Sequence, residues 1–176
     1  IVKQFEEGNA VISLQNGTNK QEIKTIIDTL KTYLVKYKNE SIKPTIGIIS
    51  PYSKQVSLLE KTIFELGIND ELKSFDLLIG SPYHFQGEER DIILLSFVVG
   101  QGDQRAASYL NKEDMFNVAI TRSRQIQHVF HCVVPAELPP KNLFRKFLEF
   151  NHKKSNDIIQ NKYICNFQEA LSQELT

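Results

Sequence analysis

The 176-residue chain is long enough for one domain with a sizeable core, because 41% of its residues are apolar. Its 21 basic and 21 acidic residues cancel, so the overall charge gives no sign of a polyanionic partner. Cys132 and Cys165 lie far apart and outside any Cys-x-x-Cys or Cys/His spacing, which gives no indication of a zinc site or a disulfide framework. We therefore expect a reduced, intracellular protein, in the cytoplasm or in the nucleus or nucleoid.

The apolar runs and the N-terminus indicate whether the chain is directed to a membrane or a secretory pathway. No apolar run is long enough to span a bilayer, and the N-terminus lacks a signal-peptide pattern, so we expect no membrane contact. The chain begins at Ile1 and not at Met, which suggests a piece of a longer protein.

The N-terminal third predicts a strand followed by a helix. Ala10–Leu14 is a short apolar run that ends in the turn sequence of residues 15–18. Thr18 or Asn19 is a suitable N-cap for a helix with Glu22 near its start. The core face of this helix is predicted to consist of Ile23, Ile26, Ile27, Leu30, Leu34 and Tyr37.

The next segments predict two more strands around a second helix. Thr45–Ser50 is almost entirely apolar, as is typical of a buried parallel strand. Pro51 opens a helix that Gly67 closes. Phe75–Gly80 is predicted to be a strand. The core face of the second helix is predicted to consist of Val56, Leu58, Leu59, Ile63 and Leu66.

The second half continues the alternation of strands and helices. Ile92–Val99 predicts a strand that is buried on both faces, and the polar segment Gly100–Ser108 predicts a loop. Lys112–Arg124 predicts a helix, and Val129–Val134 a last strand. Two C-terminal helices are predicted at Asn142–His152 and Asp157–Leu175. Such alternation predicts a mostly parallel sheet with helices on both faces.

Three motifs in a fixed order carry the functional information. They are Ser50-Pro51-Tyr52-Ser53-Lys54-Gln55, then Phe85-Gln86-Gly87-Glu88-Glu89-Arg90-Asp91, then Asn117-Val118-Ala119-Ile120-Thr121-Arg122. Together they resemble the second RecA-like domain of superfamily 1 helicases, in the subgroup of senataxin and the nonsense-mediated-decay helicases. The resemblance covers roughly Ile12 to Val134. It implies a RecA-like domain of the P-loop NTPase class over residues 1–150, with a C-terminal helical extension at 151–176.

Arg122 has two interpretations. An isolated Thr-Arg at a helix end is commonly a solvated side chain that suits the helix dipole. The resemblance instead implies that Arg122 is the arginine finger, a permanent cation that acts on a transferring phosphoryl group. Arg124 receives no such role.

Gln86, Gly87 and Glu89 are the candidates for nucleotide contact. The plain alternative is a turn in which Gly87 is needed only for its backbone angles and the glutamates face water. The resemblance implies that Gly87 lets the backbone approach phosphate and that Glu89 accepts hydrogen bonds from the ribose. Asp91 is expected to order the loop.

Ser50, Tyr52, Gln55 and Ser81 are the candidates for contact with a nucleic-acid strand. Ser50 followed by Pro51 is also a good helix-capping sequence, which needs no ligand. The resemblance implies that the hydroxyls and the helix N-terminus hold backbone phosphates.

The chain departs from the family pattern and lacks part of it. Pro82-Tyr83 replaces the usual Val-Asp, and Asp114-Met115 replaces a usual Arg-Arg pair. There is no Gly-x-x-x-x-Gly-Lys-Ser/Thr and no Asp-Glu strand end, so ATP and Mg²⁺ would be held mostly by an N-terminal RecA-like domain of the same protein. We expect no metal site within this chain, and the chain alone should be inactive.

The resemblance implies the second motor domain of an ATP-dependent helicase or translocase, with single-stranded DNA or RNA as its track and movement from the five-prime toward the three-prime end. DNA and RNA share the phosphate backbone, so the choice stays open. The alternative is a catalytically inactive RecA-like module with a binding or regulatory role. A small-molecule-binding doubly wound domain would need a Gly-rich turn after the first strand, which residues 15–18 do not supply.

Overall fold

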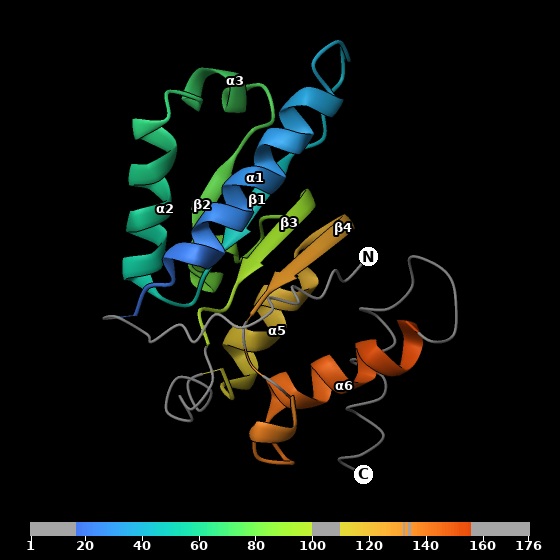
Figure 1. Cartoon of the computed structure of the whole chain (residues 1–176). Coiled ribbons are helices and arrows are strands. Elements are labelled where there is room, and N and C mark those ends of the chain that lie inside the picture. Colours follow the sequence, from blue (N-terminus) through green and yellow to red (C-terminus); the bar gives the residue numbers. More distant parts are fainter. Residues whose placement is uncertain (1–16, 100–109, 132, 134, 156–176) are drawn as a thin grey trace.

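The computed structural model describes residues 17–99, 110–131, 133 and 135–155 (Figure 1). The predicted strand Ala10–Leu14, the predicted loop Gly100–Ser108 and the predicted helix Asp157–Leu175 lie outside the described residues. Four parallel strands form one sheet in the order β2-β1-β3-β4. Their bounds are Ile46–Ile49 for β1, Leu78–Gly80 for β2, Arg90–Ser96 for β3 and Ser123–Phe130 for β4. This sheet and its helices confirm the predicted RecA-like α/β fold class.

The parallel register defines two opposite edges of the sheet. Ile48 pairs with Ile79 of β2 and with Leu94 of β3, and Leu94 pairs with His128 of β4. Because every strand runs the same way, the strand ends that lead to Ser50 and Ser81 meet at one edge, which we call the carboxyl edge. The strand starts meet at the opposite, amino edge.

The helix α1, Lys20–Lys36, covers one face of the sheet as predicted. Asn19 is its N-cap, and the Asn19 Oδ1 accepts a hydrogen bond from the Glu22 N–H at 2.9 Å. Ile26 and Leu30 have no exposed surface. The Tyr33 hydroxyl lies 2.7 Å from the His128 Nε2, which ties α1 to β4. The predicted periodicity therefore identified the buried side of this helix correctly.

The helices α2, Ser53–Glu65, and α3, Asn69–Lys73, complete this layer. Leu59 and Ile63 of α2 are buried, but Leu66 is 45% exposed, so the core face is narrower than predicted. The predicted strand Phe75–Gly80 begins only at Leu78, because Asp76 has a φ of 44°, which breaks extended backbone.

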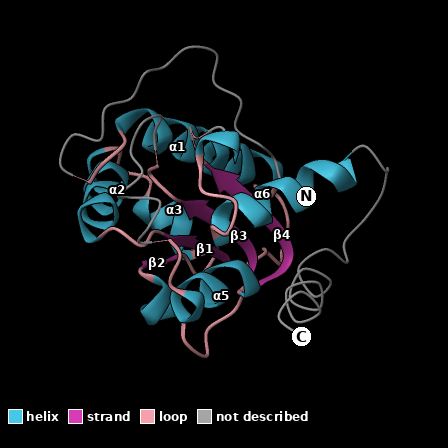
Figure 2. Ribbon diagram, turned by 90° about the horizontal axis from the view of Figure 1, so that it is seen from below, coloured by secondary structure: helices cyan, strands magenta, loops and turns pink. Residues whose placement is uncertain are grey.

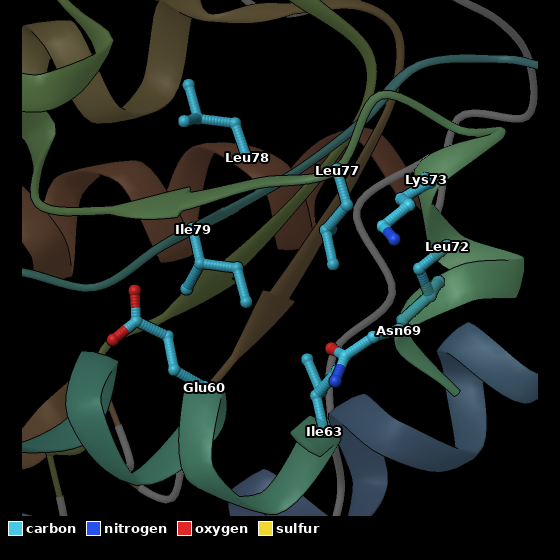
Figure 3. A pocket seen from close by; sticks show the side chains of 8 residues that line it. All are labelled: Glu60, Ile63, Asn69, Leu72, Lys73, Leu77, Leu78 and Ile79. Atoms are coloured by element: carbon cyan, nitrogen blue, oxygen red, sulfur yellow. The ribbon is translucent and has the colours of Figure 1, made fainter. Parts of the chain in front are cut away.

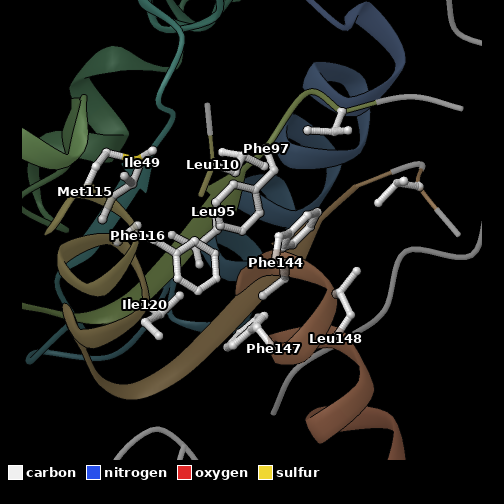
Figure 4. Close-up of a cluster of buried hydrophobic side chains, with 14 of the residues drawn as sticks. Ile49, Leu95, Phe97, Leu110, Met115, Phe116, Ile120, Phe144, Phe147 and Leu148 are labelled. Atoms are coloured by element: carbon white, nitrogen blue, oxygen red, sulfur yellow. The ribbon is translucent and has the colours of Figure 1, made fainter. Parts of the chain in front are cut away.

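In Figure 2 the helix α5, Glu113–Thr121, lies on the face of the sheet opposite α1, and the helix α6, Leu143–Ser155, shares one buried hydrophobic cluster with α5. The short 3₁₀ segments η1, Pro82–Phe85, and η2, Pro135–Glu137, join this layer. Aromatic and aliphatic side chains from these helices pack against β3 (Figure 4). The buried members include Leu95, Phe97, Met115, Phe116, Phe144, Phe147 and Leu148.

The boundary between the helix predicted at Lys112–Arg124 and the strand that follows it was misplaced. The helix predicted at Lys112–Arg124 ends at Thr121, Arg122 is its C-cap, and Ser123 already pairs with Arg90 in the sheet. The strand predicted at Val129–Val134 correspondingly starts at Ser123. The amino half of β4 is largely solvent-accessible and therefore polar, so the search for a continuous apolar run missed it.

The helix α6 runs from Leu143 through residue 150 to Ser155 without a break. The boundary between residues 150 and 151 stays a prediction. No helix in the described ranges has the length and the apolar character that crossing a membrane requires.

Candidate functional site

The amino edge brings Arg122 next to the loop that contains Gly87 and Glu89. The Arg90 N–H donates to the Arg122 carbonyl at 3.1 Å, so the end of this loop and the C-cap of α5 are in direct contact. Gly87 has a φ of 81°, and nothing would lie within 4 Å of a Cβ placed there. The left-handed backbone, and not crowding, is therefore what requires glycine at this turn.

The Arg122 side chain is held by its neighbour and is not neutralised. Its Nε and Nη2 lie 3.3 and 2.9 Å from the Thr121 Oγ1, and that hydroxyl donates to the Asn117 carbonyl at 2.8 Å. Arg122 is partly exposed. Arg90, Arg124 and Arg145 are each ion-paired, whereas Arg122 forms no ion pair with a carboxylate of the described residues. The arrangement presents an oriented cation at the surface.

The two glutamates of the loop differ in their surroundings. The Glu88 carboxylate accepts from the Arg90 Nη1 at 2.9 Å and forms an ion pair with it. The Glu89 carboxylate is exposed and forms no ion pair with a described residue. Gln86 is exposed as well. We call Gln86, Gly87, Glu89 and Arg122 the amino-edge cluster.

Asp91 and Arg124 have structural roles beside this cluster. The Asp91 Oδ2 accepts from the Thr45 N–H at 2.8 Å, and its Oδ1 accepts from the Arg124 Nε at 3.0 Å. Burial alone would raise the pKa of Asp91, but hydrogen bonds from Thr45 and Arg124 lower it below its usual value. These contacts join the starts of β1, β3 and β4. Sequence reasoning gave Arg124 no role, and the pairing partner that defines one lies 33 residues away.

The carboxyl edge brings Ser50, Tyr52 and Ser81 together. The Ser50 N–H donates to the Gly80 carbonyl at 3.0 Å, next to Ser81. The Ser50 Oγ accepts from the Tyr52 N–H at 3.3 Å, and Ser50 has no exposed surface. Tyr52 and Ser81 are partly exposed. We call these three residues the carboxyl-edge cluster, in which two side chains reach solvent.

Gln55 lies in the interior and is fully hydrogen-bonded there. Its Oε1 accepts from the Asn19 N–H at 2.8 Å, and its Nε2 donates to the Ser96 Oγ at 3.0 Å. Gln55 has no exposed surface, so it cannot touch a strand directly in this conformation. The prediction of a direct contact through Ser50 or Gln55 stays a prediction, and the burial of both residues speaks against it.

The same network contains a buried carboxyl group that sequence reasoning assigned only to a helix start. The Glu22 Oε1 accepts from the Ser96 Oγ at 2.5 Å and from the Val98 N–H at 3.2 Å. The Glu22 Oε2 has no hydrogen-bond partner among the described residues. Burial raises the pKa of Glu22 to about 8, although the bonds from Ser96 and Val98 lower it. A polar Ser96 inside an otherwise apolar run was the one available signal.

A short segment connects the two edges. Ser81 follows the end of β2 at the carboxyl edge, and Arg90 starts β3 at the amino edge. Between them, Phe85 is fully buried against the sheet. A Cβ on Gly47 would lie 2.7 Å from the Phe85 Cε1, so the glycine in β1 allows this close packing. Phe85 thus anchors the otherwise mostly exposed segment from 81 to 90, which runs between the amino-edge and carboxyl-edge clusters.

A separate hollow of about 480 Å³ lies between α2, α3 and β2 (Figure 3). Its walls include the aliphatic side chains of Ile63, Leu72, Leu77 and Ile79. It contains none of the predicted site residues, and it has few groups that could hold a nucleotide. The predicted site residues therefore lie outside this hollow.

The amino-edge cluster fits part of a nucleotide but offers no place for a metal ion. Arg122 suits a phosphate and Glu89 suits a hydroxyl donor such as ribose. Among the residues that the structure describes, no group of three or more His, Cys, Asp or Glu side chains is arranged to hold a metal. The His84 Nδ1 instead lies 3.1 Å from the Ser81 Oγ.

Comparisons with known proteins relate the chain to helicases. A family model described as an AAA domain matches residues 2–131. DNA polymerase alpha-associated DNA helicase A of Saccharomyces cerevisiae is 38% identical over 103 residues, which are 58% of this chain and 13% of that protein. Helicase SEN1 of the same yeast is 30% identical over 127 residues, which are 70% of this chain and 5% of that protein.

A third relative is named as a regulator of nonsense transcripts. Regulator of nonsense transcripts 1 homolog of Drosophila melanogaster is 29% identical over 140 residues, which are 77% of this chain and 11% of that protein. The chain thus spans a small fraction of the length of these relatives. With the three motifs on a four-stranded parallel sheet, the family match supports one assignment. The chain belongs to the AAA domain family, as a C-terminal RecA-like domain of the superfamily 1 helicases in the subgroup of senataxin and the nonsense-mediated-decay helicases.

Proposed function

We propose that this chain is the second motor domain of an ATP-dependent nucleic-acid helicase or translocase, with Arg122 as its arginine finger. The observation that carries the proposal is the state of the Arg122 guanidinium. It is partly exposed, it is oriented by the Thr121 Oγ1, and it has no carboxylate partner among the described residues. A cation that is held in place without being neutralised can stabilise the charge that develops on a transferring phosphoryl group.

The amino-edge cluster forms one wall of the ATP site in this proposal. The glycine backbone at Gly87 lies beside the phosphates, and the exposed Glu89 carboxylate accepts hydrogen bonds from the ribose. Gln86 adds a side-chain amide to the same surface. The opposite wall, with the phosphate-binding loop and the Mg²⁺ ligands, belongs to an N-terminal RecA-like domain of the longer protein. ATP with Mg²⁺ supplies the phosphoryl group, and Arg122 supplies positive charge to it.

The carboxyl-edge cluster contacts the single strand in this proposal. The partly exposed Tyr52 side chain lies at the N-terminal end of α2, and the partly exposed Ser81 hydroxyl lies at the start of η1. Hydroxyls and the backbone amides of a helix N-terminus suit a phosphate. Ser50 and Gln55 act as positioning residues, because the Ser50 Oγ accepts from the Tyr52 N–H and Gln55 holds α2 to Asn19 and Ser96. The track is single-stranded DNA or RNA.

The segment between Ser81 and Arg90, anchored in the core by Phe85, couples the two clusters in the proposed mechanism. When ATP draws the two RecA-like domains together, Arg122 and the 87–90 loop move with the nucleotide. Phe85 is fixed in the core, so this movement is transmitted to Ser81 as a rigid body. Repeated closure and opening then shift the grip on the strand.

The inactive RecA-like module remains the second candidate, and one position favours it. Met115 occupies a place where the helicase pattern usually has an arginine, and it is 1% exposed in the core. That position therefore serves packing and supplies no charge. The intact amino-edge cluster favours the active motor.

The test uses the longer protein with Arg122→Ala, and with Arg124→Ala as the matched control. Arg124 carries the same charge two residues away, but its guanidinium is bound by Asp91 and Thr45. We expect Arg122→Ala to lower strand-stimulated ATP turnover by about a thousandfold or more. Arg124→Ala should mainly lower stability. Equal and small losses of turnover in both variants would remove the finger assignment and favour the inactive module.

A further inference from the structure

A groove of about 420 Å³ lies between α1 and α2, away from the residues of both clusters. Ile23 and Ile27 line it from α1, and Leu58, Thr62 and Leu66 line it from α2. The two α1 residues are four positions apart, as are successive α2 residues, so each set forms one line along its helix. The groove therefore has a straight, mainly aliphatic floor.

This floor is in contact with water. Leu66 is 45% exposed, and Leu58 and Thr62 are partly exposed. Ile23 and Ile27 are nearly buried and form the base of the groove. Covering an accessible aliphatic strip of this kind with another apolar surface lowers the free energy.

The α1 side of the groove is positively charged. Lys20, Lys24 and Lys31 line it, and their spacing of four and then seven residues places them on one side of the helix. All three are exposed, and none forms an ion pair with a described carboxylate. Asp28 is the only acidic residue among the described residues of the lining. This concentration of positive charge stands out in a chain whose net charge is zero.

We propose that this groove binds an acidic amphipathic helix of a partner protein. Aliphatic side chains at successive turns of that helix would cover Ile27, Leu58 and Leu66, and carboxylates along its edge would face the three lysines. The distance from Lys20 to Lys31 along α1 corresponds to about 16 Å, or about three turns of helix. A partner segment of about 14 residues is long enough to fill it.

A nucleic-acid strand fits the groove less well than a peptide helix. The lysines could attract phosphates, but none of the described residues that line the groove is aromatic, so they offer bases no ring to stack on. A charged sugar-phosphate backbone buries little apolar surface when it covers an aliphatic floor, so such binding is only weakly favourable. The proposal therefore commits to a peptide, and strand binding becomes an outcome of the test.

The test measures fluorescence anisotropy with the 176-residue chain and three labelled probes. The probes are an acidic amphipathic helical peptide of about 14 residues, the same peptide with Lys in place of each Glu, and a mixed-sequence single-stranded DNA. We expect the acidic peptide to bind at least about tenfold more tightly than the basic one at low salt. Added salt should reduce this difference.

Matched variants locate the binding. Lys24→Glu with Lys31→Glu should weaken binding of the acidic peptide by about tenfold. Lys36→Glu with Lys38→Glu makes the same charge change at exposed positions outside the groove and should leave it nearly unchanged. Leu66→Ala should weaken binding, whereas Phe64→Ala, at a residue that is 75% exposed and does not line the groove, should not. Circular dichroism confirms that each variant is folded.

The proposal is overturned if the acidic peptide binds no more tightly than the basic peptide. It is equally overturned if the DNA strand displaces the acidic peptide completely. The same holds if the Lys24/Lys31 double variant and the Lys36/Lys38 double variant weaken binding of the acidic peptide equally. No step of this test needs ATP turnover, so its outcome is independent of the role proposed for Arg122.

Discussion

Replacing the buried carboxyl group of Glu22 by an amide should change how stability depends on pH. Glu22 has no exposed surface, and its Oε1 already accepts from the Ser96 Oγ and the Val98 N–H. Its pKa is raised from an ordinary 4.5 to about 8, mainly by burial. Glu22→Gln keeps the size and the accepting oxygen but cannot ionise.

The direction in which stability changes with pH depends on how many protons the folded and unfolded chains bind. Below pH 4.5 Glu22 is protonated in both folded and unfolded chains, so it contributes no slope. Between 4.5 and about 8 the unfolded chain releases this proton while the folded chain keeps it, so stability falls as the pH rises. The loss is about 1.4 kcal/mol per pH unit, which amounts to a few kcal/mol over this interval. Above about 8 both states are ionised and the slope disappears.

The assay is urea unfolding of the wild-type chain and of Glu22→Gln at several pH values from about 5 to about 9. We expect the stability of the variant relative to the wild type to increase by about 1.4 kcal/mol per pH unit up to about pH 8, and then to level off. Glu60→Gln makes the same substitution at an exposed position of α2, outside the buried network, and is the matched control. If the curves for wild type and Glu22→Gln are parallel across the range, Glu22 is not a neutral buried acid and the account of this network is wrong.

Three further predictions concern activity, strand binding and packing. The 176-residue chain alone should show no appreciable ATP turnover, and phosphate release at about one per second or faster with Mg²⁺, ATP and a single strand would contradict the two-domain site. In the longer protein Ser81→Ala should weaken the affinity for all strands alike, with little change in salt dependence because the lost hydroxyl is neutral. Fluorescence anisotropy with mixed-sequence and homopolymer strands measures this affinity. An unchanged affinity would leave Ser81 with only its structural role as the N-cap of η1. Gly47→Ala should lower the free energy of unfolding by about 1–3 kcal/mol, because the added Cβ would lie 2.6 Å from the Ile93 Cδ1. Urea unfolding measures this change. If the urea concentration at the unfolding midpoint did not fall, Phe85 and Ile93 would be shown to move aside at no cost in stability.

The parts of the fold that sequence could predict are those governed by local patterns. The α1 face around Ile26 and Leu30 follows helical spacing, and β1 is a continuous apolar run, so both were located. The start of β2 could not be placed, because no turn signal in the sequence of this segment indicated the positive φ of Asp76. The polar first half of β4 was assigned to the preceding helix, because its strand character comes from pairing with β3.

The candidate site divides in the same way. Gly87 and Arg122 lie within contiguous motifs, so their residue types and order could be recognised, and the structure brings their segments together. The bond between Ser96 and Glu22 joins residues 74 positions apart, and that between Gln55 and Asn19 joins residues 36 positions apart. Such long-range partners have no local signature. Sequence reasoning therefore gave Gln55 a place on the surface and left Glu22 as an ordinary helix start.

The proposed motor function requires that Arg122 acts in the transition state and not in nucleotide binding. The decisive measurement takes ATP affinity and strand-stimulated ATP turnover from the same preparation of the Arg122→Ala longer protein. We predict that turnover falls by about a thousandfold or more while ATP affinity changes by less than about tenfold. Turnover close to that of the wild type, or a loss of affinity as large as the loss of turnover, would contradict the arginine-finger role.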